Sequence, residues 1–280
     1  MVSLRLKRGA ERGHALAVTL APLLSLRDIS KRFVTSRHDT PAIEHLSLDV
    51  SAGEFVCVVG PSGCGKSTLL NIIAGLDRAD GGEALFDGRP IRGPGRERVV
   101  VFQDPALYPW LNVRANVEFG LKIRGVRGSE RRALTDRYLD LVNLRAFERA
   151  FVHELSGGMK QRVQLARALA VEPRMLLMDE PFAALDAQTR DVLQEELQEI
   201  WLRTGATIVF VTHNVREAAI LADRVIVMTP HPGRIKCEIA VPLQRPRKPD
   251  THAVVDFASE IRKELQNDVH TSRGAGGYVI

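Results

Sequence analysis

Apolar and polar residues alternate along two early segments of the chain, LSLRDISKRF at 24–33 and AIEHLSLDV at 42–50. This period of two is typical of half-buried antiparallel strands. EFVCVVG at 54–60 is instead continuously apolar, and STLLNIIAGL at 67–76 has the apolar spacing of a helix. GGEALFDGRPI at 81–91 predicts a turn and a short strand. The order is therefore a β-rich start, then a buried strand, a loop and a helix.

The middle of the chain, between Asp104 and Leu155, is rich in helix formers and charged residues. Four residues with spacings of three and four share one apolar helix face, namely Leu134, Tyr138, Leu141 and Val142. We interpret this part as a helical insertion.

Two further buried strands, RMLLMDE at 174–180 and ATIVFVTH at 206–213, are separated by the helical segment DAQTRDVLQEELQEIWLRT at 186–204. Strands that alternate with helices form right-handed crossovers and a parallel sheet. The sequence therefore predicts an α/β fold.

The pattern of apolar and polar residues divides the chain into three parts. Residues 1–24 are expected to be a disordered or mis-started extension. The main domain is expected at 25–241, with a helical subdomain at about 104–160. The remainder, 242–280, reads as a linker rich in Pro and Arg, a short helix and a loose tail.

Composition narrows the classes of function. With 45% hydrophobic and 26% charged residues and a formal net charge of +5, the chain is ordinary for a globular protein, and no basic stripe with interleaved aromatics indicates nucleic-acid binding. The three cysteines lack the CxxC spacing of a zinc site. Residues 15–24 resemble a signal peptide, but Pro22 interrupts them and no cleavage pattern follows. No apolar run approaches the ~20 residues of a spanning helix, so a membrane role requires a partner.

GPSGCGKS at 60–67 matches the phosphate-binding pattern GxxxxGK[ST], and it stands between a predicted strand and a predicted helix. Its glycines let backbone N–H groups turn inward around phosphates at the helix N-terminus. Lys66 would contact the β- and γ-phosphates, and the Ser67 hydroxyl would bind Mg²⁺. The predicted nucleotide-binding residues of this stretch are Gly60, Pro61, Ser62, Gly63, Cys64, Gly65, Lys66, Ser67 and Thr68.

Polar residues also follow the other predicted strands, at the carboxyl edge where open α/β sheets bind ligands. Asp179 is expected to hold Mg²⁺, and Glu180 is the natural general base for an attacking water. His213 could touch the γ-phosphate or that water, although a lone histidine is more often structural. Gln103 could sense Mg²⁺ or water and report to the helical insertion. An acidic pair at a strand end can also be only a helix cap.

Together with these residues, the motifs GPSGCGKST, VVVFQD, LSGGMKQR, LLMDEP, AALD and THN resemble an ABC transporter ATPase in order and spacing. The resemblance covers about 26–241. It implies a P-loop NTPase fold with a mixed RecA-like core sheet, an antiparallel β subdomain and a helical subdomain. It also implies ATP and Mg²⁺ as cofactors, and a homodimer in which each nucleotide lies between the P-loop of one chain and the LSGG of the other.

The resemblance assigns further residues. Ser156, Gly157 and Gly158 would contact the nucleotide of the second subunit from the start of a helix that we expect to open at Met159. Phe33 would stack on adenine, although a Phe at a strand end could equally belong to the core. Two residues depart from the family pattern, since Met159 replaces the usual Gln and Asn214 the usual Asp. Asp186 would communicate across the dimer.

IRGPGRERVVVFQDPALYPWLNVRANVEFGL at 91–121 and TPHPGRI at 229–235 resemble the ATPases of nitrate, sulfonate and taurine importers. This type implies two transmembrane permease subunits, a periplasmic solute-binding protein, and a peripheral location on the cytoplasmic face of the inner membrane. Residues 106–121, which include Trp110, could form an exposed apolar patch for the permease or a part of the core.

Two other functions are weaker interpretations. A soluble ABC ATPase acting on DNA or ribosomes would usually carry a coiled-coil insertion, a CxxC zinc hook or two cassettes, and none of these features is visible in the sequence. A small-molecule kinase with a P-loop would have no use for LSGG.

Overall fold

The computed structural model describes residues 21–34 and 39–266. The predicted extension at 1–24 and the tail after Gln266 therefore lie largely or wholly outside the described residues. The first strand begins at Leu24, and Leu23 and Leu24 are already buried.

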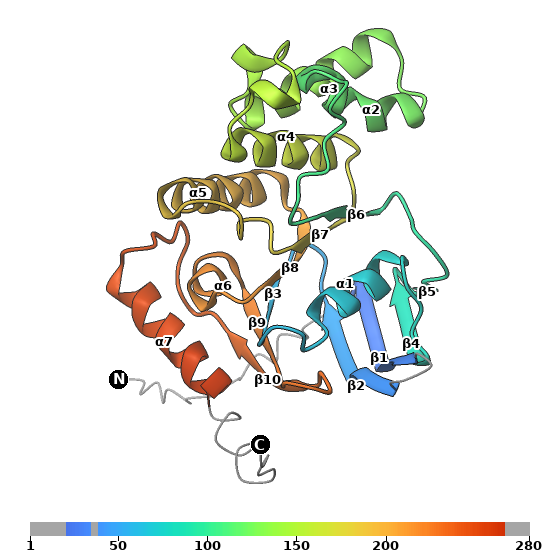
Figure 1. The fold of residues 1–280 in the computed structure, drawn as a ribbon, viewed down its shortest axis with the longest axis vertical. Coiled ribbons are helices and arrows are strands. Elements are labelled where there is room, and N and C mark those ends of the chain that lie inside the picture. The colour runs from blue at the N-terminus through green and yellow to red at the C-terminus, as the bar shows by residue number, and fades with distance from the viewer. Residues whose placement is uncertain (1–20, 35–38, 267–280) are drawn as a thin grey trace, which may run out of the picture.

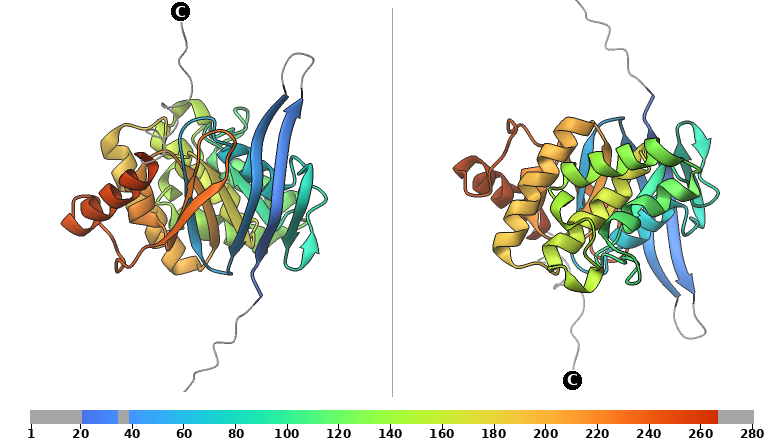
Figure 2. Two further views of the ribbon diagram at one scale, coloured as in Figure 1. Left: turned by 90° about the horizontal axis from the view of Figure 1, so that it is seen from below. Right: turned by 90° about the horizontal axis from the view of Figure 1, so that it is seen from above.

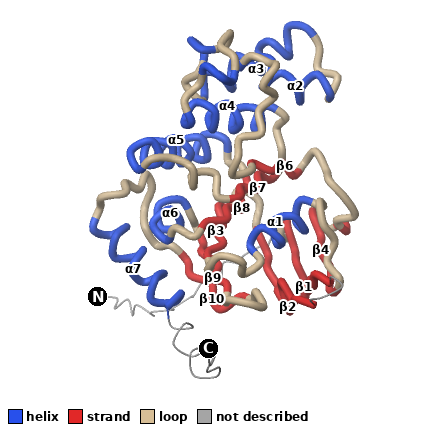
Figure 3. Tube along the Cα trace, viewed as in Figure 1, coloured by secondary structure: helices blue, strands red, loops and turns tan. Residues whose placement is uncertain are grey.

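The strands form two sheets (Figures 1 and 3). An antiparallel sheet has the order β2-β1-β4-β5, and a larger, mainly parallel sheet has the order β10-β9-β3-β8-β7-β6. Only β10 runs antiparallel to its neighbour in the larger sheet. The strands are β1 Leu24–Val34, β2 Asp39–Val50, β3 Phe55–Val59, β4 Gly81–Phe86, β5 Arg89–Pro90, β6 Arg98–Val101, β7 Met175–Asp179, β8 Thr207–Thr212, β9 Arg224–Met228 and β10 Ile235–Ala240.

The helices lie on both faces of the larger sheet and above it, with α2, α3 and α4 grouped at one end of the molecule (Figures 1 and 2). This group contains the predicted helical insertion. The helices are α1 Lys66–Ala74, α2 Val113–Ile123, α3 Gly128–Leu141, α4 Gly157–Ala170, α5 Ala187–Thr204, α6 Val215–Leu221 and α7 His252–Gln266, with short 3-10 turns η1 Arg145–Phe147 and η2 Val152–Glu154. None of the helices in the described part of the chain is long and apolar enough to cross a membrane.

β3 is apolar along its whole length because it is covered on both faces. Val56 and Val58 face the core shared with α1 and the antiparallel sheet, whereas Phe55, Cys57 and Val59 face the core shared with the other helices. A strand covered on both faces needs apolar residues at every position. The phosphate loop that follows β3 is thereby attached to a strand that is buried at every position.

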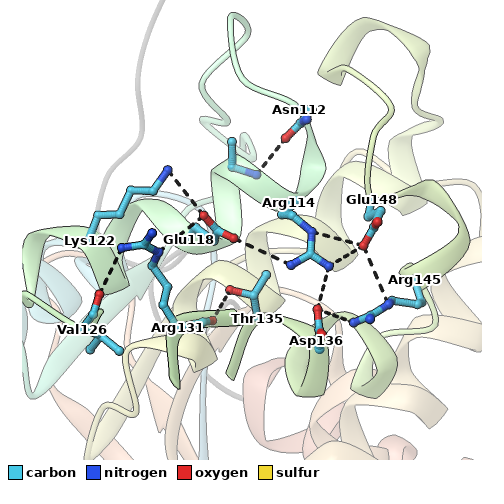
Figure 4. A network of polar contacts seen from close by, with 11 residues as sticks. Asn112, Arg114, Glu118, Lys122, Val126, Arg131, Thr135, Asp136, Arg145 and Glu148 are labelled. Carbon is cyan, nitrogen blue, oxygen red and sulfur yellow. Dashed lines mark hydrogen bonds and ion pairs between the residues drawn. The ribbon is translucent and has the colours of Figure 1, made fainter. Parts of the chain in front are cut away.

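An ion-pair network ties the helical insertion together (Figure 4). Arg114 of α2 donates to Asp136 of α3, at 2.6 Å, and to Glu148. Glu118, one turn further along α2, pairs with Lys122 and with Arg131 of α3. Since these contacts join α2, α3 and the segment after η1, the insertion is held by charge as well as by its apolar face.

Two arginines anchor the segment after β10 to α5 and α6. Arg247 is buried and donates to the carbonyl oxygens of Ala219, Ile220 and Ala222 at the end of α6. Burial lowers its pKa to about 10. The guanidinium of Arg245 lies 4.2 Å from the ring centroid of Trp201. The linker predicted from Pro and Arg content is thus a packed connection to α7.

Candidate nucleotide site

The phosphate loop connects β3 to α1, as predicted. Gly63 and Gly65 have φ of 76° and 93°, in the left-handed region that favours glycine. A Cβ at Gly65 would lie 2.7 Å from the carbonyl oxygen of Ala42 in β2, so the loop also needs glycine to pass close to another backbone. The loop is therefore curled against the antiparallel sheet.

Lys66 begins α1 and is only 5% exposed. Its Nζ donates to the carbonyl oxygens of Gly60, at 2.9 Å, and Pro61, at 2.8 Å. Cys64 is buried with its Sγ 3.8 Å from the same ammonium, and burial raises the pKa of the thiol. The ammonium group of Lys66 therefore links the end of the loop back to its beginning, and the neighbouring Cys64 thiol stays neutral.

A cavity of about 310 Å³ opens above the loop. Phe33 lines it from the end of β1 and is 46% exposed, so this side chain is not part of the core. Three lining residues were not predicted, namely Thr40, Ala42 and His231, and the predicted ones that line it are Phe33, Ser62, Gly63, Gly65, Lys66, Ser67, Thr68 and Glu180.

Ser67 and Asp179 are brought together from α1 and the end of β7. The Ser67 hydroxyl donates to Asp179 Oδ1 at 3.1 Å. Burial raises the pKa of Asp179, while the hydrogen bond from Ser67 acts in the opposite direction. In the described part of the chain no cluster of three His, Cys, Asp or Glu side chains could hold a metal ion. One hydroxyl and one carboxylate nevertheless fit Mg²⁺, which takes few protein ligands and completes its shell with phosphate oxygens and water.

Glu180 and His213 stand side by side at the ends of β7 and β8. Nδ1 of His213 lies 2.8 Å from Oε2 of Glu180. Glu180 has a φ of 44°, and its N–H donates to the carbonyl oxygen of Val211 in β8. This left-handed backbone is uncommon for a residue with a side chain and turns the carboxylate toward the cavity that Glu180 lines.

A buried carboxylate supports the turn that carries His213. Thr212 donates from its hydroxyl to Glu217 at 2.6 Å, and the same hydroxyl accepts from the N–H of Asn214. Glu217 is 4% exposed, and burial raises its pKa. Asn214 caps α6 by accepting from the N–H of Arg216. The family's usual Asp at this position is thus replaced by a residue that still caps the helix.

Gln103 lies two residues beyond β6 and is exposed. Its carbonyl oxygen accepts from Nε2 of Gln161, and the carbonyl of Phe102 accepts from Nε2 of Gln164. Both donors belong to α4. The backbone at Phe102 and Gln103 is therefore fastened to α4.

The LSGG segment is separate from the phosphate cavity. Ser156 is the N-cap of α4 and accepts from the N–H of Met159, so the helix begins at Gly157, not at Met159 as predicted, because the two glycines form its first turn. A Cβ at Gly158 would lie 2.7 Å from Cγ2 of Thr189 in α5. Asp186 is the N-cap of α5 and accepts from Thr189 N–H, which lowers its pKa. The lining of the phosphate cavity includes none of Ser156, Gly157, Gly158 and Asp186.

His231 is one of the cavity residues that sequence reasoning missed. It comes from the loop between β9 and β10, whose Gly233 exchanges backbone hydrogen bonds with Ala42 and Glu44 of β2. The signal was present in TPHPGRI, which the sequence analysis used only to assign a transporter type.

Comparison with known proteins agrees with this geometry. Residues 43–183 match the family model described as ABC transporter. The chain is 48% identical over 220 residues to the nitrate import ATP-binding protein NrtD of Synechocystis sp., covering 79% of this chain and 83% of that protein. It is 51% identical over 195 residues to the taurine import ATP-binding protein TauB of Mesorhizobium japonicum, covering 70% and 76%.

A solved dimeric ATP-binding cassette in a post-hydrolysis state, bound to ADP and Pi, superposes with a TM-score of 0.69 at 32% identity and covers 79% of this chain and 100% of that one. The predicted α/β fold with its mixed sheet and helical subdomain is confirmed. The resemblance to ABC transporter ATPases of the nitrate and taurine import group, which the motifs indicated, is also confirmed. The chain therefore belongs to the ABC transporter family, as an ATP-binding subunit that hydrolyses ATP.

Proposed function

We propose that the chain energises an importer for an inorganic or organic anion such as nitrate, taurine or an alkanesulfonate. Two relatives that are 48% and 51% identical to this chain are named for nitrate and taurine import, and they support this class of solute. The motor role is carried by one observation, the contact between Glu180 and His213 beside the Ser67–Asp179 pair. The alternative of a soluble ATPase acting on DNA or ribosomes is not favoured by these relatives.

In this proposal the phosphate loop holds the β- and γ-phosphates of ATP. Backbone N–H groups of Gly63 and Gly65 and the start of α1 supply donors, and Lys66 supplies the positive charge once its Nζ exchanges two carbonyl partners for phosphate oxygens. Phe33, exposed at the end of β1, offers a ring for the adenine. The phosphates would thus replace contacts that the loop makes with itself.

Ser67 and Asp179 would hold Mg²⁺, with the exposed Gln103 amide as a further oxygen ligand. When bound, the ion neutralises phosphate charge. Glu180 would accept the proton of the attacking water, and His213 would hold the carboxylate in place through the 2.8 Å contact. A base fixed between β8 and an imidazole loses little orientational freedom on binding substrate.

The site requires a second copy of the chain. Ser156 and Gly157 are exposed at the N-terminus of α4 and lie outside the cavity of their own chain. A helix N-terminus with two glycines lets a phosphate approach the backbone closely. In a head-to-tail homodimer, this end of α4 would cover the γ-phosphate bound by the partner, and Asp186 would lie near the same interface.

The membrane partners would be two permease subunits, with a periplasmic solute-binding protein delivering the anion to them. The chain would sit on the cytoplasmic face of the inner membrane as a peripheral subunit. Trp110 is 71% exposed, whereas Leu107 in the same segment is buried. The aromatic side chains around Trp110 are in contact, with Tyr108 5.5 Å from its ring centroid. We propose that this exposed ring binds the permease.

Substitution of the base tests the proposal. Glu180→Gln removes the proton acceptor and leaves the phosphate loop intact, so ATP turnover should fall by about 10²-fold or more. ATP binding should persist, and the ATP-bound variant should elute as a dimer. Glu195→Gln, at an exposed position of α5, is the matched control. Undiminished turnover in Glu180→Gln would refute the base, and loss of turnover in the control would show that the effect is not local.

A further inference from the structure

A second large cavity, which we call the arginine cavity, lies beside β5 and at the amino ends of β6 and β7. Arg98 opens β6 opposite Met175 of β7, whereas Asp179 stands at the other end of β7. The nucleotide cavity and this one share no lining residue. The volume is about 690 Å³, and six of the lining residues are arginines, namely Arg89, Arg92, Arg96, Arg98, Arg124 and Arg174.

The acids of the cavity offset only part of this charge. Asp87 accepts two hydrogen bonds from Arg174, at 2.5 and 3.0 Å, and these hold the pKa of Asp87 below its ordinary value. Glu97 pairs with Arg98 at 2.7 Å. With Glu172 as the third acid, six arginines face three carboxylates, which leaves a formal charge of +3.

Three of the arginines are exposed, and one of them, Arg89, is close enough to Asp87 to help lower the pKa of that carboxyl. Arg89, Arg92 and Arg96 are exposed, and in the described ranges none of their side chains forms an ion pair or a hydrogen bond. Arg124 uses one nitrogen on the carbonyl of Val171, at 2.7 Å. The guanidinium groups of Arg89, Arg92, Arg96 and Arg124 therefore have most of their donors unused, whereas those of Arg98 and Arg174 are already paired.

Arg98 adds a buried cation to the cavity wall. It is 8% exposed, lies 5.0 Å from the ring centroid of Phe86, and donates to the carbonyl of Gly93. Its Nε is buried, and no acceptor for it exists among the described residues. Arg98 is thus fixed in the wall by its contacts with Gly93, Glu97 and Phe86.

The segment that carries Arg92 and Arg96 is held in place. A Cβ at Gly75, the left-handed C-cap of α1, would lie 2.1 Å from the carbonyl oxygen of Gly93, so this backbone passes directly over the end of α1. Arg98 donates from its N–H to the carbonyl of Gly95. The arginines are thus presented by a packed loop, which reduces the entropy lost when a ligand binds.

We propose that the arginine cavity binds a small organic polyanion that carries two or more phosphate groups. Guanidinium forks match phosphate oxygens in geometry, and several of them around one space favour multiple phosphates over a single oxyanion. The volume is that of a nucleotide-sized ligand. Pro90, Pro94 and Val171 in the wall provide apolar contacts for the uncharged part of the molecule.

Titration calorimetry on the full chain tests this site, with inositol hexakisphosphate as the polyanion and inorganic sulfate as the single oxyanion. The double variant Arg92→Ala/Arg96→Ala should weaken binding of the polyanion by about tenfold or more, because each lost guanidinium removes charge-assisted hydrogen bonds. The control variant Arg127→Ala/Arg132→Ala removes the same charge from exposed positions outside the cavity and should bind as the wild type does. Lys66→Ala, which disables the phosphate loop, should also leave binding unchanged.

Three results would overturn the proposal. Equal losses in the two double variants would mean unspecific attraction to net charge. Loss of binding in Lys66→Ala would place the probe in the nucleotide site. Sulfate binding as tight as that of the polyanion would exclude recognition of multiple phosphates.

Discussion

Arg114 is the centre of the ion-pair network in the helical insertion, and its replacement by Met should loosen that insertion without disturbing the sheets. Met keeps much of the apolar stem of Arg but removes the hydrogen bonds to Asp136 and Glu148. These carboxylates are about one quarter exposed, at 27% and 25% of their side-chain surface. Arg145 continues to pair with both acids after the substitution.

The magnitude follows from this partial exposure. A hydrogen bond to a charged group contributes about 1.5–3 kcal/mol when buried, and an exposed ion pair contributes less than about 1 kcal/mol. We therefore expect a loss of about 1 kcal/mol for each of the two hydrogen-bonded partners, or about 2 kcal/mol in total, and little from the looser 3.7 Å ion pair with Glu118. Since about 1.4 kcal/mol corresponds to a factor of ten, amide hydrogen exchange in α2 and α3 should accelerate roughly 30-fold.

Hydrogen exchange measured by mass spectrometry separates this local effect from global unfolding. Peptides of β3 and β8 should exchange as in the wild type, and Arg149→Met, at an exposed position without a partner among the described residues, should change nothing.

The stabilisation by Arg114 should also depend on pH. The hydrogen bond from Arg114 lowers the pKa of Glu148 in the folded protein. Such a group stabilises the folded state fully when the pH lies above its unfolded pKa, near 4, and this stabilisation is lost as the pH falls through the folded pKa. The difference between wild type and variant should therefore be complete at pH 7 and shrink below about pH 4. Unchanged exchange in α2 and α3 at pH 7 would refute the role of Arg114.

Three further predictions concern the nucleotide site and its partners. Lys66→Ala should weaken ATP binding itself, measured by calorimetry, and unchanged affinity would count against the phosphate role of Lys66. Trp110→Ala should abolish transport or assembly with the permease in membranes while the isolated subunit still binds nucleotide, and lost binding would sink the docking role. ATP turnover per subunit should rise with protein concentration, because Ser156 and Gly157 act on the partner's nucleotide, and a rate independent of dilution would contradict a shared site.

The sequence was sufficient for features that are local. The apolar run of β3, the glycines after it and the helical spacing from Lys66 identify the phosphate loop because each is set by neighbours in the chain. Asp179 and Glu180 could be placed at the sheet edge because a buried strand must deliver the residues that follow it to its carboxyl end. The left-handed backbone of Glu180 depends on its bond to Val211 in another strand, which no local pattern encodes.

Features that depend on distant segments were not predictable. His231 reaches the cavity only because Gly233 pairs with β2, and a Cβ at Gly233 would lie 2.0 Å from the carbonyl of Cys64. Whether Phe33 is buried or exposed depends on where β1 ends relative to β2. The arginine cavity gathers residues from β5, from the loop after it and from the ends of α2 and α4. Only folding brings these charges together around one cavity.

The hydrogen bonds of α4 give the proposed transport cycle a physical link between its two ends. Gln161, Gln164 and Arg167 donate to backbone carbonyls of residues 102–106, so the segment that leads to Trp110 is fastened to α4 along one face. Ser156 caps the other end of that helix. In that cycle α4 would move as a rigid element, so a permease segment that displaces the Trp110 region would also displace Ser156. The nucleotide that responds would be the one held by the partner chain. Membrane contact on one subunit would thereby lead to closure or opening of the site in the other.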